Sequence, residues 1–269
     1  YRSVDTFYYK LATRLDIDTL ARYAKDLGLG QRTGVALPGE VPGLMADSAW
    51  KKRVYKSEWY PGETLSVIIG QGQVDTTPIQ LANMMAGVAN GGTIYKPRLL
   101  KYVEGQDGSV LEKTEPEILH QTKWSAHNLA LVKKGLRAVF EREDGTAHGS
   151  FVPGIDVGGK TGSAQVVKYT ADTLFKNNCA AQPRRYRLHG IFVGFAPIDD
   201  PKIAVAVVAE HSCGGATGAA PMAAAIMKRY LQKLDPEKYG EEALKIAKAE
   251  YWKAKLTNRK APASTPAAD

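Results

Sequence analysis

The stretch Gly158-Gly159-Lys160-Thr161-Gly162-Ser163-Ala164-Gln165-Val166-Val167 decides how the rest of this sequence is interpreted. Its second half alternates small and apolar residues, which predicts a β-strand. Thr161 and Ser163 are two positions apart, so their hydroxyls point to the same side of that strand. Lys160 adds a positive charge, and Gly162, which has no Cβ, lets a ligand approach the backbone. This combination suits an extended substrate that ends in a carboxylate.

The Lys-Thr-Gly triplet alone is weak, because a glycine turn that enters an ordinary strand would have the same spelling. The chain has 269 residues, of which 44% are hydrophobic, enough for one large domain or two small ones. No apolar run approaches the roughly 18 residues of a membrane span. Tyr1 is not an initiator methionine and no signal peptide opens the sequence. We therefore expect a fragment of a longer protein.

The net charge of +8 is unevenly placed, because residues 227–269 hold ten Lys or Arg and six Asp or Glu. Such a basic tail could meet nucleic acid or an anionic membrane surface. We favour a solvated helix with a disordered end, and we expect no nucleic-acid partner.

Two cysteines, Cys179 and Cys213, are compatible with one disulfide or with none. A zinc set built from them with His189 and His211 would match no common ligand spacing. We expect no metal and no cofactor.

Along the chain, apolar spacing predicts a helix from about residue 5 to 27, and Ser3 and Asp5 could simply cap it. Residues 31–63, rich in Gly, Pro and Trp, predict a long ordered loop. Further helices are predicted at 78–89, 125–140, 219–234 and 241–256. Strands are predicted at 94–103, 110–113, 159–168, 189–196 and 202–210, a strand or short turn at 65–69, an overhanging loop at 170–187 and a disordered end at 258–269.

Together these motifs resemble the penicillin-binding transpeptidases and serine β-lactamases, which carry S-x-x-K, S-x-N or S-x-D, and K-T-G in that order. Ser3-Val4-Asp5 fits the second motif and Lys160-Thr161-Gly162 the third. Other stretches resemble the penicillin-binding protein 2 class, the class B transpeptidases of cell elongation. They are Gly43-Leu44-Met45, Trp59-Tyr60-Pro61-Gly62-Glu63-Thr64, Gly70-Gln71-Gly72, Thr77-Pro78-Ile79-Gln80-Leu81, Gly145-Thr146-Ala147 and Gly194-Phe195-Ala196-Pro197.

Two departures from the family pattern matter. The family's nucleophile precedes the second motif, and this sequence begins too late to contain it. Ser48-Ala49-Trp50-Lys51 spells S-x-x-K but follows the second motif, in the predicted loop, so we interpret it as a decoy. Some relatives have a zinc-liganding cysteine between the Ser and the Asp, where this chain has Val4.

The resemblance implies acyl transfer through a serine acyl-enzyme formed on a peptidoglycan stem peptide, with β-lactams as mimics. It implies that Ser3 relays a proton, that Asp5 orients the neighbouring lysine by its charge, and that Lys160 attracts the substrate carboxylate. Thr161 and Ser163 would hydrogen-bond that carboxylate, and the Ser163 N–H would form half of an oxyanion hole. The acyl donor would lie as an added strand along the edge from Ser163 to Val167, which includes Gln165, with Gly162 leaving room for it.

The implied fold is the α/β (α+β) penicillin-binding domain, a mainly antiparallel sheet flanked by helices plus an all-helical region. We expect residues 1–235 to form this domain without its S-x-x-K segment, 236–257 a basic helix and 258–269 a tail. The resemblance also implies an upstream anchor in a bacterial inner membrane, a periplasmic position and a glycosyltransferase partner. The alternatives are a penicillin-sensing or scaffold domain without turnover, and a serine β-lactamase.

Overall fold

A three-stranded antiparallel sheet forms the centre of the computed structural model, which describes residues 2–167 and 179–260. Its strands are β7 (Gly158–Ala164), β8 (His189–Ala196) and β9 (Ile203–Ala209), in the order β7-β8-β9. Lys160 lies opposite Val193 in the register of β7 and β8. The predicted strands are confirmed, although β7 ends at Ala164, and its predicted continuation at 165–167 is not strand.

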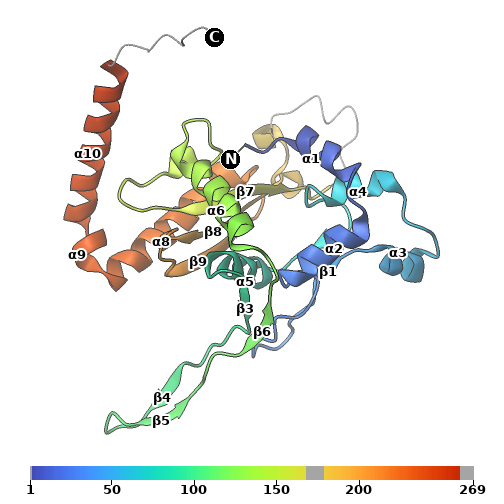
Figure 1. The fold of residues 1–269 in the computed structure, drawn as a ribbon, viewed down its shortest axis with the longest axis horizontal. Helices are drawn as coiled ribbons and strands as arrows, with labels where there is room; N and C mark the ends of the chain where they lie inside the picture. Colours follow the sequence, from blue (N-terminus) through green and yellow to red (C-terminus); the bar gives the residue numbers. More distant parts are fainter. Residues whose placement is uncertain (1, 168–178, 261–269) are drawn as a thin grey trace.

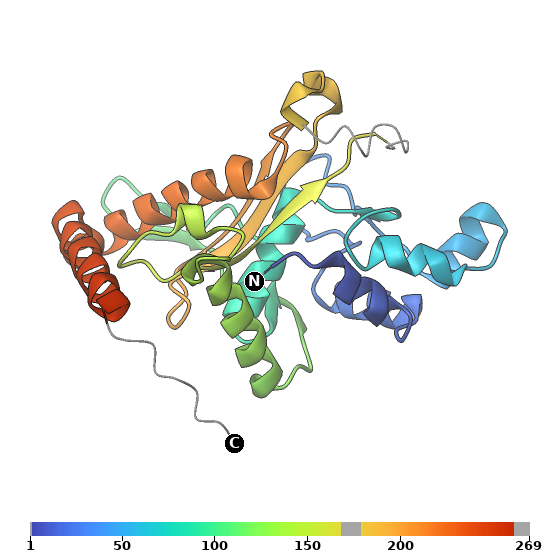
Figure 2. The same ribbon diagram turned by 90° about the horizontal axis from the view of Figure 1, so that it is seen from above.

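Helices cover both faces of this sheet, as Figures 1 and 2 show. Because side chains alternate along a strand, Phe192 packs with α8 (Ala220–Leu234) and Phe195 packs with α5 (Pro78–Ala89). Helix α6 (Ala126–Glu141) contributes side chains to both of these cores. The sheet therefore lies between helical layers, and the predicted fold class is confirmed.

The all-helical region predicted beside the sheet contains α1 (Asp5–Ala12), α2 (Ile17–Asp26), α3 (Ser48–Tyr55) and α4 (Pro61–Val67). The prediction of one helix from 5 to 27 is wrong, because Asp16 starts a second helix by accepting a hydrogen bond from the Thr19 backbone N–H at 2.8 Å. An apolar core joins α2 and α4 to the small ribbon of β1 (Leu44–Met45) and β2 (Val74–Asp75).

The segment predicted as a long loop, 31–63, includes β1, all of α3 and the start of α4. The predicted strand or turn at 65–69 is also wrong, because most of it is helical. Pro61 at the first position favours α4, and the Glu63 carboxylate accepts from the Tyr60 N–H at 2.9 Å. These local caps outweigh the apolar run that follows them.

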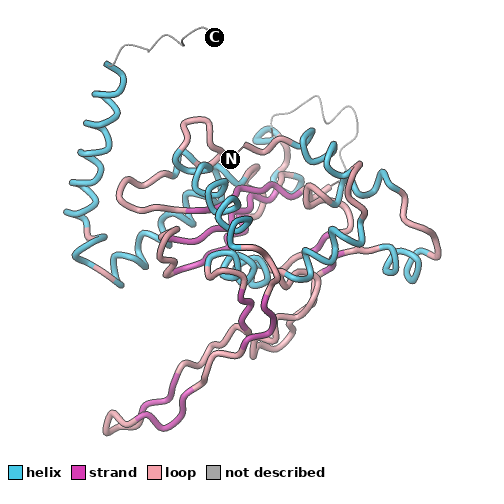
Figure 3. Tube along the Cα trace, in the orientation of Figure 1, coloured by secondary structure: helices cyan, strands magenta, loops and turns pink. Residues whose placement is uncertain are grey.

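A long ribbon projects from the other side of the molecule (Figures 1 and 3). Its base pairs β3 (Thr93–Tyr95) with β6 (Ile118–Gln121), and its tip pairs β4 (Tyr102–Glu104) with β5 (Val110–Lys113). The sequence Gly105-Gln106-Asp107-Gly108, which predicts a hairpin turn, joins β4 and β5. The single strand predicted at 94–103 is two strands, and Pro97 lies in the break between them, where its missing N–H suits the gap in pairing.

At the C-terminal side, α8 is followed by α9 (Pro236–Tyr239) and α10 (Glu241–Lys260). The predicted helix of 236–257 is thus two helices, and α10 continues into the segment predicted as a tail. The rest of that tail, 261–269, lies outside the described residues, as do residues 170–178 of the predicted overhanging loop and residue 168 of the predicted strand. Within residues 2–167 and 179–260, none of the helices combines the length and the apolarity that a membrane span requires.

Candidate active site

The strand β7 has a free edge, because no other strand of the described residues pairs with it on the side away from β8. Two side chains reach carbonyl groups of this strand. Lys160 Nζ donates to the Thr161 carbonyl at 2.8 Å, and Gln71 Nε2 donates to the Ser163 carbonyl at 3.0 Å. The Ser163 carbonyl accepts from a side chain that belongs to neither β7 nor β8, so we infer that it points away from β8, toward the free edge. In an antiparallel strand the N–H and C=O of one residue point to the same side, and residues two apart share that side. The N–H groups of Thr161 and Ser163 therefore point outward as well.

Lys160 holds the N-terminal segment against this strand. Its Nζ donates to Ser3 Oγ at 2.6 Å across 157 residues of sequence. Burial of the half-buried side chain lowers the pKa of Lys160, and the negative charge of Asp5 partly opposes this shift. Asp5 is the first residue of α1. The lysine is therefore a desolvated cation beside a hydroxyl and a carboxylate.

Ser3 and Asp5 could have been ordinary helix caps, and the structure answers this point. The N-cap of α1 is Val4, and no side chain caps this end of the helix. The Ser3 hydroxyl instead accepts from Lys160. Next to it, the exposed Arg2 forms an ion pair of 2.6 Å with Asp144, which attaches the N-terminal segment to the turn after α6.

Thr161 makes a contact that the sequence did not suggest. Its Oγ1 donates to Thr146 Oγ1 at 2.8 Å. Thr146 belongs to the turn after α6, and the Gly145-Thr146-Ala147 stretch was part of the family resemblance without a role of its own. Gln71, in the Gly70-Gln71-Gly72 stretch, was likewise part of the resemblance and had no assigned role. Both residues come near β7 only through the tertiary fold.

A cleft of about 650 Å³ lies over these groups. Of the seven predicted site residues, it is lined by Ser3, Asp5, Lys160, Thr161, Gly162 and Ser163. Gln165 follows the end of β7, is exposed and is not among the lining residues. The other residues of the lining are Val4, Tyr8, Ile68, Ile69, Gln71, Thr146, Gly214, Gly215 and Ala216.

The Ser48-x-x-Lys51 spelling lies on α3 rather than in a loop, so that part of the prediction is wrong. The two side chains are nevertheless engaged elsewhere. Ser48 Oγ donates to Asp18 at 2.7 Å, and the buried Lys51 ammonium pairs with Glu63. Neither residue lines the cleft. Lys51 is therefore not placed to take a proton from Ser48.

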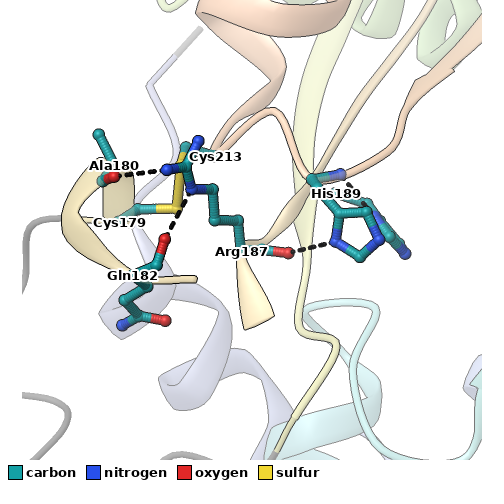
Figure 4. The surroundings of a disulfide bond; sticks show 7 residues. Cys179, Ala180, Gln182, Arg187, His189 and Cys213 are labelled. Atoms are coloured by element: carbon teal, nitrogen blue, oxygen red, sulfur yellow. Dashed lines mark hydrogen bonds between the residues drawn. A yellow bond between two sulfur atoms is a disulfide. The ribbon is translucent and has the colours of Figure 1, made fainter. Parts of the chain in front are cut away.

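Cys179 and Cys213 form a disulfide, which answers the question that the sequence left open. Figure 4 shows Arg187 beside it, donating to the carbonyl groups of Ala180 and Gln182. The bond excludes these cysteines as zinc ligands. Among the residues that the structure describes, no other group of three or more His, Cys, Asp or Glu side chains is arranged to hold a metal ion.

The disulfide also lies close to the cleft along the chain. The backbone N–H of Cys213 donates to the Leu188 carbonyl at 3.0 Å, just before β8 begins. The next residues, Gly214 to Ala216, line the cleft and enter the one-turn π-helix η4 (Gly215–Ala219). A Cβ on Gly215 would lie 2.5 Å from the Gly162 carbonyl, so only glycine allows this close approach to β7.

Comparisons with known proteins agree with this geometry. A family model described as the penicillin binding protein transpeptidase domain matches residues 1–228. The Haemophilus influenzae peptidoglycan D,D-transpeptidase MrdA is 34% identical over 247 residues, or 88% of this chain and 36% of that protein. The chain thus spans about a third of the length of this relative.

Solved structures give the same result. The crystal structure of Pseudomonas aeruginosa PBP2 in complex with WCK 5153 matches 84% of this chain and 45% of that chain, with a TM-score of 0.67 and 35% identity. A complex between PBP2 and MreC from Helicobacter pylori matches 86% of this chain and 38% of that chain, with a TM-score of 0.67 and 26% identity. The family predicted from the motifs is confirmed: the chain belongs to the penicillin-binding protein transpeptidase domain family.

Proposed function

We propose that these residues belong to a peptidoglycan D,D-transpeptidase of the elongation type, in which they supply most of the acyl-donor site. The contact between Lys160 Nζ and Ser3 Oγ at the free edge of β7 carries this proposal. It joins the second and third family motifs in one cleft. The names of the relatives support the same reaction, since the Haemophilus protein is called a D,D-transpeptidase.

In the proposed reaction, a serine from an S-x-x-K motif upstream of these residues attacks the penultimate D-Ala carbonyl of a stem peptide. The C–N bond to the terminal D-Ala breaks, and an ester to the serine remains. Ser3 is suited to pass a proton to the departing amine, because its hydroxyl already accepts from the Lys160 ammonium. Asp5 orients the motif lysine through its charge. An amine of a second stem peptide then attacks the ester, forms the cross-link and releases the serine.

Charge on the reacting oxygen is stabilised at β7. The outward-pointing N–H of Ser163 is one donor of the oxyanion hole, and a donor of this kind typically contributes about 3–4 kcal/mol. Lys160 attracts the terminal carboxylate. The hydroxyls of Thr161 and Ser163 bind that carboxylate, for which Thr161 turns its proton away from Thr146. Gly162 keeps the approach open, and Gln165 contacts the donor peptide beyond the end of the strand.

The alternatives differ in the fate of the acyl-enzyme. A penicillin-sensing or scaffold domain would keep its acyl group and form no cross-link. A serine β-lactamase would hydrolyse it through a deacylating base. We favour the transpeptidase because its relatives carry that name.

The setting of the parent protein is part of the same proposal. The Helicobacter complex contains PBP2 and MreC, which supports a place in an elongation assembly. A glycosyltransferase partner belongs to this proposal through the family resemblance alone. We propose a periplasmic position at the inner membrane, through an anchor upstream of these residues.

Intact-mass spectrometry of the full-length protein with a labelled penicillin tests this function. We expect one slowly hydrolysed adduct, mapped to a serine outside residues 1–269. Ser48→Ala should acylate normally, because Ser48 donates to Asp18 and does not line the cleft. An adduct on Ser48, or no adduct at all, would contradict the proposal. Rapid turnover of the penicillin would favour a β-lactamase instead.

A further inference from the structure

Gln71 occupies a position that the acyl donor needs. Its side-chain amide donates to the outward-pointing carbonyl of Ser163 at 3.0 Å, at the free edge of β7. A peptide that joins this edge as an added strand must donate its own N–H groups to the outward carbonyls. The Ser163 carbonyl could accept two hydrogen bonds, but both donors approach it from the open side of β7. Gln71 and the incoming peptide therefore compete for the same space beside this carbonyl.

The segment that carries Gln71 is built to hold this contact from outside the sheet. It connects α4, which ends at Val67, to β2, which begins at Val74. Gly70 and Gly72 flank Gln71 with φ of 77° and 70°, which side chains rarely adopt. The Gln71 backbone N–H donates to the Ser66 carbonyl at 3.0 Å. The backbone is thus anchored, while the half-buried side chain extends into the cleft.

We propose that Gln71 is a latch on the acyl-donor subsite: its amide covers the Ser163 carbonyl in the free enzyme and must be displaced when an amide-bearing donor binds. This inference rests on the function proposed above. Gln71 is a residue that sets specificity rather than a catalytic one. Donors with an N–H for the Ser163 carbonyl break the latch contact, whereas donors without that group leave it in place.

The energetic size of the latch follows from ordinary hydrogen bonding. An intramolecular hydrogen bond of this kind has a net worth that corresponds to a change of about 3- to 10-fold in an equilibrium constant. Removing it should increase the second-order rate constant of acylation by that factor for an amide-bearing donor. A donor that never uses the carbonyl should show less than about a twofold change.

The test compares two probes on the full-length protein with Gln71→Ala and Gln71→Asn, whose side chains are too short to keep the contact. Benzylpenicillin carries an amide N–H beside its β-lactam ring, and penicillanic acid, unsubstituted at that carbon, carries none. We expect both variants to acylate faster with benzylpenicillin only. Gln73→Ala is the matched control, since Gln73 lies in the same segment but does not line the cleft.

The ratio of the acylation rates with benzylpenicillin and penicillanic acid separates a latch from a purely structural residue. If Gln71 were purely structural, its substitution would change both rates alike and lower the melting temperature. Slower acylation by benzylpenicillin alone would mean that Gln71 binds the donor, and this would overturn the latch. An unchanged ratio would overturn it too. If the unaltered protein reacts with neither probe, the proposed function fails, and the inference fails with it.

Discussion

Lys160 shows how one residue combines several physical constraints. Its position on β7 places the side chain at the cleft, its burial lowers its pKa, and its hydrogen bonds reach Ser3 and the Thr161 carbonyl. A lysine whose charged form is disfavoured by burial and supported by hydrogen bonds is sensitive to pH. This sensitivity can be measured in two ways.

The first measurement is the alkaline limb of penicillin acylation. The pKa of Lys160 lies below its ordinary 10.5, so the ammonium loses its proton earlier than a solvated lysine. We expect acylation to fall as pH rises through this lowered pKa, because the proposed function requires the charged Lys160 to attract the substrate carboxylate. Lys160→Arg should keep its charge and lose this limb, whatever its absolute rate. The control Lys202→Arg, at an exposed position, should keep the same alkaline limb as the unaltered protein. An identical limb in Lys160→Arg would contradict the assignment.

The second measurement is stability. Between the lowered pKa and 10.5, unfolded chains bind more protons at this lysine than folded ones, so the free energy of unfolding should rise with pH in that window. Below the window both states are protonated, and the burial of the charge costs stability. Lys160→Met should remove this rise, which urea unfolding at several pH values would detect. A rise of equal slope in Lys160→Met would have to come from another group.

Within β7, the element that carries the site, the glycines are selected by packing as well as by function. The ring of the buried Phe192 lies beneath Gly159, where a Cβ would lie 2.3 Å from it, and a Cβ at Gly158 would lie 3.1 Å from the buried Ile198. Gly162 differs, because a Cβ there would make an ordinary contact of 3.5 Å with Ile191. The double glycine before Lys160 is therefore a structural requirement of the sheet.

A matched pair of alanine variants tests this distinction. Gly159→Ala should lower the free energy of unfolding by about 1–3 kcal/mol, because Phe192 has no free space to move into. Gly162→Ala should change it by less than about 0.5 kcal/mol. Urea unfolding followed by circular dichroism compares them. Equal effects of the two substitutions would contradict the packing argument.

The disulfide is a second feature that holds elements together, because it joins η2 (Cys179–Ala181) to the segment that enters η4. Its loop of 34 residues corresponds to about 3–4 kcal/mol of stabilisation in the chain-entropy account. We expect Cys179→Ser with Cys213→Ser to lose that amount in urea unfolding. A reductant should destabilise the unaltered protein equally and leave the double variant unchanged. A loss below about 1 kcal/mol would mean that other contacts hold this segment.

In the molecule as a whole, most of the projecting ribbon lies away from the apolar cores. Every residue of β4, β5 and β6 is exposed, whereas Ile94 at the base is buried among the helices. The ends of the tip are already adjacent, since the Thr114 N–H donates to the Lys101 carbonyl at 3.0 Å. The tip can therefore be removed without stretching the chain.

Replacing residues 102–113 by an Asn-Gly turn should change the free energy of unfolding by less than about 1 kcal/mol and leave acylation intact. Ile94→Ala is the contrast within the same ribbon and should cost about 2–4 kcal/mol. Thermal unfolding and penicillin labelling of both variants give the comparison. A large loss of stability in the shortened protein would show that the tip packs against the domain.

The sequence by itself determined the features that depend on neighbouring residues. Alternation in the Lys-Thr-Gly stretch predicted β7, apolar runs predicted β8 and β9, and a glycine-rich turn predicted the tip of the ribbon. The helix predicted at 125–140 is α6, whose start is capped by the Ser125 hydroxyl. Local signals failed where two of them competed, as at Asp16, where an uninterrupted apolar spacing concealed the start of a second helix.

Only the tertiary structure decided which distant groups meet. Ser3 and Lys160 are 157 residues apart, and Gln71 and Ser163 are 92 residues apart, so no periodicity records either contact. Motif resemblance brought the first pair together, but it assigned no role to Gln71 or Thr146. The disulfide was undecided for the same reason, because two cysteines can bond only when the fold brings their Cα atoms within about 7 Å. Such proximities arise from the packing of the whole domain, and a linear pattern does not contain them.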